Sequence, residues 1–210
     1  MIPEIHSNIN NVFSKRSPIG IYDKTILCEK CDQYLGILDG YAQKLLIQDF
    51  SEELAVRNVN TKMAYKIDKY DYKKLKLFFL SVLWRASISS QSFYRKIEIG
   101  AHENIIKGMI RYEDPGEPFE YSVSLAKFSD PRMIAMLDPH KKRLDGINYC
   151  QIYMTGFVVY IKVDKREPPV FLRELCLSKD PPFWIILRDL NNSKDGKIIK
   201  EIASKAIRHQ

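Results

Sequence analysis

The feature that most constrains the fold is a change in hydrophobic periodicity near the middle of this 210-residue chain. Over most of the sequence before residue 113, apolar residues recur every three or four positions, which is the spacing of amphipathic helices. The turn-forming run at residues 113–118, EDPGEP, then interrupts the pattern. Beyond it apolar and polar residues alternate, as they do in half-buried strands. This order predicts an α+β protein.

The first part of the chain is expected to be mainly helical. Helices are predicted at residues 32–50, 71–86 and 101–112, with one strand at residues 62–67 and a short strand at 25–27. Residues 77–84 are apolar on nearly all sides, so the second helix belongs in the middle of the fold. Asp71 is its predicted N-cap. We expect Lys73, Lys74 and Lys76 to lie at a solvated helix end, with phosphate contact as the alternative.

The second part is expected to form a mainly antiparallel sheet followed by a C-terminal helix. Strands are predicted at residues 119–125, 133–137, 147–154, 157–163 and 183–187, and the terminal helix at residues 195–208. Thr155-Gly156 separates two of these strands and marks a hairpin. The predicted division is therefore a helical part, 1–114, and a sheet part, 115–210, which together can form one compact domain.

Composition narrows the class of protein. With 45% hydrophobic residues, 9 Gly and 10 Pro, the chain is neither collagen-like nor of low complexity. Its longest apolar run is far shorter than the roughly 20 residues that span a bilayer, and the first residues do not form a signal peptide. We therefore expect a cytoplasmic protein without a membrane partner. The formal net charge of +7 is compatible with a nucleic-acid partner.

The strongest local motif is the pair Cys28 and Cys31, with the sequence Cys-Glu-Lys-Cys. Two thiolates at this spacing can bind one metal ion, and zinc is the usual one, although a structural zinc site needs four ligands. Two alternatives stay open, a redox pair at the start of a helix and plain structural cysteines. Cys150 and Cys176 are expected to be small buried hydrophobic residues.

Residues 26–36, ILCEKCDQYLG, resemble the zinc-knuckle half of HNH-type (ββα-metal) proteins. Residues 1–4, MIPE, are similar to the end of the element that carries the catalytic histidine in that family. The longer pattern, with residues 39–46 and 84–87, resembles uncharacterised bacterial proteins that contain such a knuckle. The resemblance implies zinc at Cys28 and Cys31, association with nucleic acid and a role in prokaryotic antiviral defence.

The chain also departs from the HNH pattern. A second Cys-x-x-Cys motif is missing, and Asp32 stands where the family usually has Asn or His. His6 does not match the position of the catalytic histidine, which cleavage requires as a base beside a metal ion. The catalytic residues are therefore unassigned. We expect a degenerate catalytic site, with a metal-dependent HNH-like nuclease as one alternative.

Basic residues in the second part are the candidates for nucleic-acid contact. They form three groups: Lys141, Lys142 and Arg143 in a predicted loop, Lys165 and Arg166 at a strand end, and Lys197 and Lys200 on the terminal helix. Tyr149, Tyr153 and Tyr160 offer aromatic faces to bases, although tyrosines in strands more often pack half-buried. The main alternative function is a non-enzymatic protein–protein interaction subunit of a larger complex.

Overall fold

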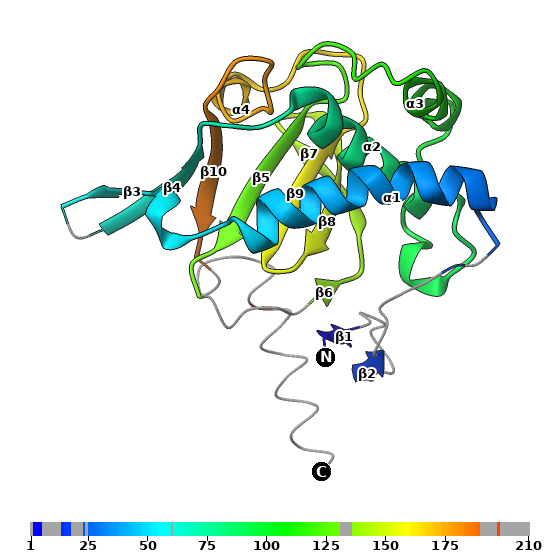
Figure 1. Cartoon of the computed structure of the whole chain (residues 1–210), viewed down its shortest axis with the longest axis horizontal. Helices are drawn as coiled ribbons and strands as arrows, with labels where there is room; N and C mark the ends of the chain where they lie inside the picture. Colours follow the sequence, from blue (N-terminus) through cyan, green and yellow to red (C-terminus); the bar gives the residue numbers. More distant parts are fainter. Residues whose placement is uncertain are drawn as a thin grey trace.

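The computed structural model describes residues 2–5, 14–17, 23, 25–59, 61–130, 136–189 and 197. A seven-stranded sheet forms its centre, and two long helices cross one face of that sheet (Figure 1). In spatial order the strands are β3 (Ala55–Asn58), β4 (Thr61–Ile67), β10 (Phe183–Arg188), β5 (Val123–Phe128), β9 (Phe157–Lys162), β8 (Ile147–Met154) and β7 (His140–Leu144). A smaller sheet has the order β2 (Ser14–Ser17), β1 (Ile2–Ile5), β6 (Met136–Leu137).

The helices lie mostly before the central strands in sequence. They are α1 (Glu29–Gln43), which continues as the π-helical turn η1 (Lys44–Gln48), then η2 (Glu52–Leu54), α2 (Tyr72–Ile88), η3 (Ser92–Tyr94), α3 (His102–Arg111) and α4 (Val170–Arg173). The α+β class predicted from the sequence is confirmed. The predicted C-terminal helix lies outside the described residues, apart from Lys197.

The central sheet is mixed. Five of its neighbouring strand pairs are antiparallel, and β5 and β10 are parallel. The predicted hairpin is present, because Met154 pairs with Phe157 around Thr155 and Gly156. Both turn residues have positive φ, 44° and 82°, which suits the right-handed twist of the two strands. Strand β4 comes from the first part of the chain and pairs with β10 from the second.

Helix α2 is the central helix, as its all-round apolar sequence predicts. Leu77, Phe79 and Leu80 are fully buried in the main core. Asp71 caps the helix by accepting a hydrogen bond from the backbone amide of Lys74 at 3.0 Å. Arg85 donates two hydrogen bonds to Asp39 of α1, at 2.7 and 2.9 Å, and so joins the two helices.

Four local predictions were wrong. The strand predicted at residues 119–125 begins only at Val123, because residues 119–121 form a turn. Residues 140–143 form strand β7 and not a loop, because β8 supplies backbone partners along their whole length. Residues 25–27 are not a strand. Lys76 is fully buried, whereas Lys73 and Lys74 are exposed as expected. The loop before β5 accounts for Lys76, because its carbonyl groups surround the ammonium group.

Candidate nucleic-acid interface

Two depressions lie beside the ends of β8 and β9, and His102 lines both. The larger one, which we call the loop depression, has a volume of about 770 Å³. Its walls are the loop before β5, the start of α3, the segment after β9, and α4 with the residues that follow it. The smaller one, the edge depression, has a volume of about 570 Å³ and lies between β7 and the turn before α3. Both volumes are in the range of ligand-binding pockets.

Lys162 lines the loop depression although the side chain is almost completely buried. Its ammonium group donates hydrogen bonds to the backbone carbonyls of Asp164, at 2.8 Å, and Arg166. Burial lowers the pKa of Lys162, since the charged form loses its hydration. Cys176 lines the same depression, and its thiol donates to the carbonyl of Leu172 at 3.2 Å. A cation and a thiol therefore lie at one end of the sheet.

Lys76 positions the loop that forms one wall of this depression. Its ammonium group donates to three carbonyls, of Glu120 at 2.8 Å and of Glu117 and Pro118 at 3.4 Å each. Burial lowers the pKa of Lys76 to about 7. All three accepting residues line the depression, so Lys76 ties this wall to helix α2.

A row of polar residues crosses β7, β8 and β9 at the same end of the sheet and continues to Ser122, the residue before β5. Tyr149 on β8 lies opposite both Lys162 on β9 and Lys142 on β7, and Ser122 accepts a backbone hydrogen bond from Lys162. Among the described residues, neither the Ser122 nor the Tyr149 hydroxyl has a hydrogen-bond partner, and both are buried. Burial raises the pKa of Tyr149 to about 12. The nearby Ser122 hydroxyl opposes this rise, although the two hydroxyl groups do not form a hydrogen bond of ordinary geometry.

His102 begins α3 and separates the two depressions. Its Nδ1 atom lies 3.0 Å from the hydroxyl of Tyr121, and the two rings meet edge to face. Sequence reasoning assigned no partner to His102, because Tyr121 is 19 residues away and lies in a different element.

The structure brings five of the seven predicted nucleic-acid residues to these depressions or their rim. Lys141 and Arg143 are exposed and line the edge depression, and Lys165 is exposed and lines the loop depression. Lys142 also lines the edge depression, but its ammonium group donates to Gln151 Oε1 at 3.1 Å. Arg166 forms an ion pair with Asp164 at 2.7 Å, which holds the pKa of that carboxyl group well below its usual range.

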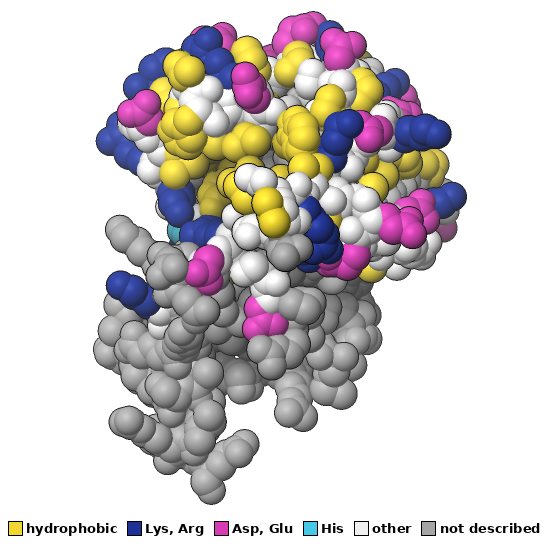
Figure 2. All heavy atoms as spheres, turned by 90° about the vertical axis from the view of Figure 1, so that its left-hand side faces the viewer, with side chains coloured by type: hydrophobic (Ala, Val, Ile, Leu, Met, Phe, Trp, Pro, Cys, Tyr) yellow, Lys and Arg dark blue, Asp and Glu magenta, His cyan; other side chains and the backbone are white. Residues whose placement is uncertain are grey.

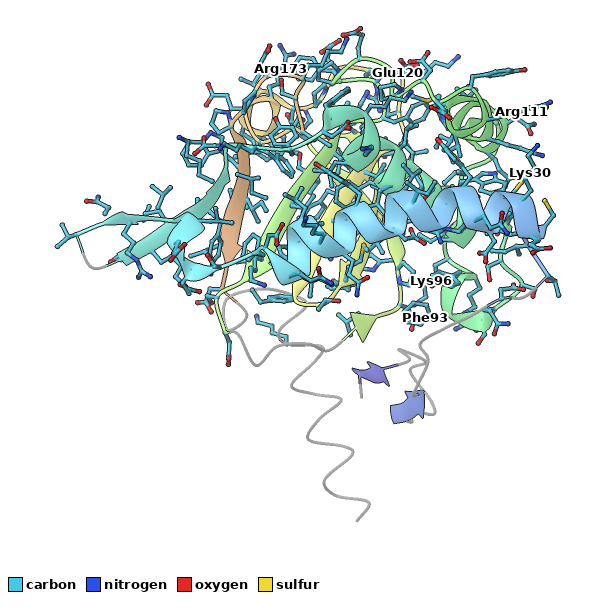
Figure 3. All side chains as sticks on the ribbon, viewed as in Figure 1. Lys30, Phe93, Lys96, Arg111, Glu120 and Arg173 are labelled. Carbon is cyan, nitrogen blue, oxygen red and sulfur yellow. The ribbon has the colours of Figure 1, made fainter. Side chains whose placement is uncertain are left out.

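The other two predicted residues do not join this group. Lys197 is exposed, and no contact places it near either depression. Lys200 lies outside the described residues. Sequence reasoning missed Arg173, which is exposed, lines the loop depression and lies 6.0 Å from the centre of the Phe119 ring. Figure 3 shows Arg173 and Glu120 at the same end of the molecule, one on α4 and the other on the loop before β5.

Cys28 and Cys31 lie at the N-terminal end of α1 and line neither depression. Both thiols are exposed, and Cys28 is the N-cap residue. The backbone amide and the thiol of Cys31 lower the pKa of Cys28, whereas the Cys28 thiol raises the pKa of Cys31. In the part of the chain that is described, no group of three or more His, Cys, Asp or Glu side chains is placed to hold a metal ion. Zinc at this pair stays a prediction.

None of the helices in the described ranges is long and apolar enough to cross a membrane. A scan of protein-family models and searches of curated proteins and solved structures returned no match for this chain.

Proposed function

We propose that this protein binds single-stranded nucleic acid across the loop and edge depressions. The observation that supports the proposal is the convergence of separate basic segments on two adjoining hollows. Lys141 and Arg143 from β7 lie on one side of His102, and Lys165 from the segment after β9 lies on the other. A single-stranded nucleic acid that crosses the surface at His102 would meet basic side chains on both sides of this residue.

The groups around the depressions suit a flexible strand better than a rigid duplex. Single-stranded nucleic acid is bound by a basic groove combined with aromatic side chains on which bases stack. Phe119, which is partly exposed, lines the loop depression beside Arg173 and Lys165. The resemblance to HNH-type proteins, which is itself a prediction, favours the same class of ligand.

Acidic side chains also line the loop depression, and two of them are neutralised by neighbours. Arg166 pairs with Asp164, and Lys179 pairs with Glu117 at 2.7 Å. The other two, Glu120 and Glu167, offset the exposed cations Lys165 and Arg173. The excess of positive charge therefore lies at the edge depression, where Lys141, Lys142 and Arg143 are accompanied by one carboxylate among the described residues, that of Glu98. This depression is able to attract phosphate groups.

The test is binding of a fluorescent 12-nucleotide single-stranded DNA or RNA, followed by anisotropy at several salt concentrations. The double variant Lys141→Gln/Arg143→Gln is expected to bind about tenfold or more weakly at low salt, because it loses two phosphate contacts. The slope of log affinity against log salt is expected to become shallower by about 1.4, at roughly 0.7 per phosphate contact.

The matched control is Lys44→Gln/Lys69→Gln, which removes the same charge from two exposed lysines that line neither depression. Its affinity and salt slope should stay close to those of the wild type. An equal loss in both double variants, or no salt-dependent binding by the wild type, would contradict the proposal.

A second candidate function is a docking subunit for another protein. Figure 2 shows hydrophobic side chains gathered in the upper half of the face formed by the left-hand side of Figure 1. The elements on that side carry exposed large hydrophobic residues, namely Val59, Met63, Val170, Phe171 and Ile186. Loss of a co-purifying partner on Phe171→Glu, with oligonucleotide binding unchanged, would favour this function.

A further inference from the structure

The first turn of α1 contains two nucleophilic side chains that the proposed interface does not use. Cys28 and Cys31 are both exposed, whereas Cys150 and Cys176 are buried within the sheet region. The chain therefore has one accessible pair of thiols and two thiols that its core protects. Figure 3 places Lys30, which belongs to the same turn, at the end of α1 away from η1.

The backbone at this turn has the spacing that a disulfide needs. Cys28 is extended, with φ −80° and ψ 159°, and its carbonyl accepts the first helical hydrogen bond from Asp32 at 2.9 Å. Residues three apart in such a turn have Cα atoms about 5 Å apart. Disulfide-linked residues have Cα atoms roughly 4.4–6.8 Å apart, so the bond can form without moving the rest of the helix.

The rest of α1 is held firmly, so a reaction at its first turn stays local. Leu35 and Leu38 are buried in the main core. Farther along, Asp39 forms the bidentate ion pair with Arg85 of α2. Closing a disulfide between Cys28 and Cys31 therefore costs little of the packing that keeps α1 on the sheet.

We propose that Cys28 and Cys31 form a reversible disulfide by exchange with a low-molecular-weight disulfide of the glutathione class. The Cys28 thiolate attacks one sulfur of the glutathione disulfide; a mixed disulfide forms, and one glutathione leaves as a thiolate that takes up the proton Cys28 lost. Cys31 then gives up its proton, attacks Cys28 Sγ and expels the second glutathione. Two protein thiols are oxidised to one disulfide, and one glutathione disulfide is reduced to two thiols.

The test uses the reduced full-length protein, equilibrated under native conditions with mixtures of reduced and oxidised glutathione. After an acid quench, free thiols are alkylated and the peptides are analysed by mass spectrometry. The peptide that contains Cys28 and Cys31 should lose two hydrogen atoms and resist alkylation, while Cys150 and Cys176 stay reduced. Before oxidation, the exposed pair should be alkylated at least ~100-fold faster than the buried thiols, which react only after local opening.

The variant Cys31→Ser separates the two steps. It keeps the attacking thiol but lacks the second one, so it should accumulate the glutathione adduct on Cys28 at least ~10-fold above the wild type. The wild-type measurement needs no variant and holds even if Cys31→Ser folds poorly. Wild-type thiols that stay reduced, or that each carry a separate glutathione, would overturn the proposal. So would zinc bound to the purified protein and lost on Cys28→Ser, because the thiols would then be metal ligands.

Discussion

The two faces of the central sheet are built from the same strands and yet differ sharply in chemistry. On the face that packs against α2, Leu125, Val159 and Ile152 lie opposite one another and are 1%, 1% and 4% exposed. The neighbouring residues on these strands belong to the other face of the sheet. There the corresponding row consists of Ser124, Tyr160 and Gln151. Both rows are largely buried, so burial alone does not make a face apolar. The first face supplies the core, and the second brings buried polar groups next to the candidate interface.

The largest effect is expected from the apolar face. Phe79 of α2 is fully buried and borders the same small cavity as Leu125 and Val159. Phe79→Ala should lower the free energy of unfolding by about 3–5 kcal/mol, since it removes apolar contacts and leaves a cavity. Urea denaturation followed by circular dichroism measures the change. Phe171→Ala, at a side chain 63% exposed, is the control and should change stability by no more than about 0.5 kcal/mol. A similar loss of unfolding free energy in both variants would contradict the assignment of Phe79 to the core and of Phe171 to the surface.

The second prediction concerns Lys76, the buried cation at the polar end of the sheet. Its pKa is about 7 in the folded protein and about 10.4 when unfolded, so between these values the unfolded state binds more protons. The stability contributed by this group should therefore rise with pH across that window, by up to about 1.4 kcal/mol per pH unit. Urea denaturation at pH 7.5, 8.5 and 9.5 should show this rise in the wild type relative to Lys76→Met.

The matched control for this experiment is Lys74→Met, because Lys74 is exposed on the same helix. This variant should keep the pH dependence of the wild type. Equal slopes in the wild type and Lys76→Met would show that the three carbonyl groups hold Lys76 charged in the folded protein. The polar end of the sheet would then contain a permanent buried cation.

The smallest of the three effects is expected on the polar face. Gln151 is fully buried, donates a hydrogen bond to the Tyr153 hydroxyl and accepts one from Lys142 at 3.1 Å. Gln151→Leu has a similar volume but removes both hydrogen bonds, and it should cost about 1–3 kcal/mol of unfolding free energy. Thermal and urea denaturation measure this cost. A gain in stability would show that the polar row is kept at the expense of stability, in contrast to the apolar row.

Much of the architecture was predictable because its signals are local. The α2 segment is apolar on nearly every side, and Thr155-Gly156 has turn chemistry between two alternating runs; both elements lie where the sequence places them. Strand β7 was missed because its run of His, Lys, Lys and Arg has no apolar alternation. It is the last strand of the sheet, and charged residues are common on such edges.

The candidate interface was predictable only in part. The basic residues of β7 and of the segment after β9 were selected from the sequence as charge clusters. That these residues lie near one another was not predictable from the sequence. The register of the hairpins and the path of the loop before β5 bring them together around His102. Arg173 lines the loop depression from helix α4, which begins 26 residues after the end of β7.

The sequence by itself determined the α+β class, the central helix and the paired thiols, because periodicity, turn residues and short spacings act over a few residues. Only the tertiary structure decided which lysines are buried and which basic segments meet. Lys76 shows the reason most clearly. Its helix neighbours Lys73 and Lys74 face solvent, but three carbonyl groups more than 40 residues away enclose its ammonium group. Such long-range contacts are set by how the whole chain packs, and no local pattern encodes them.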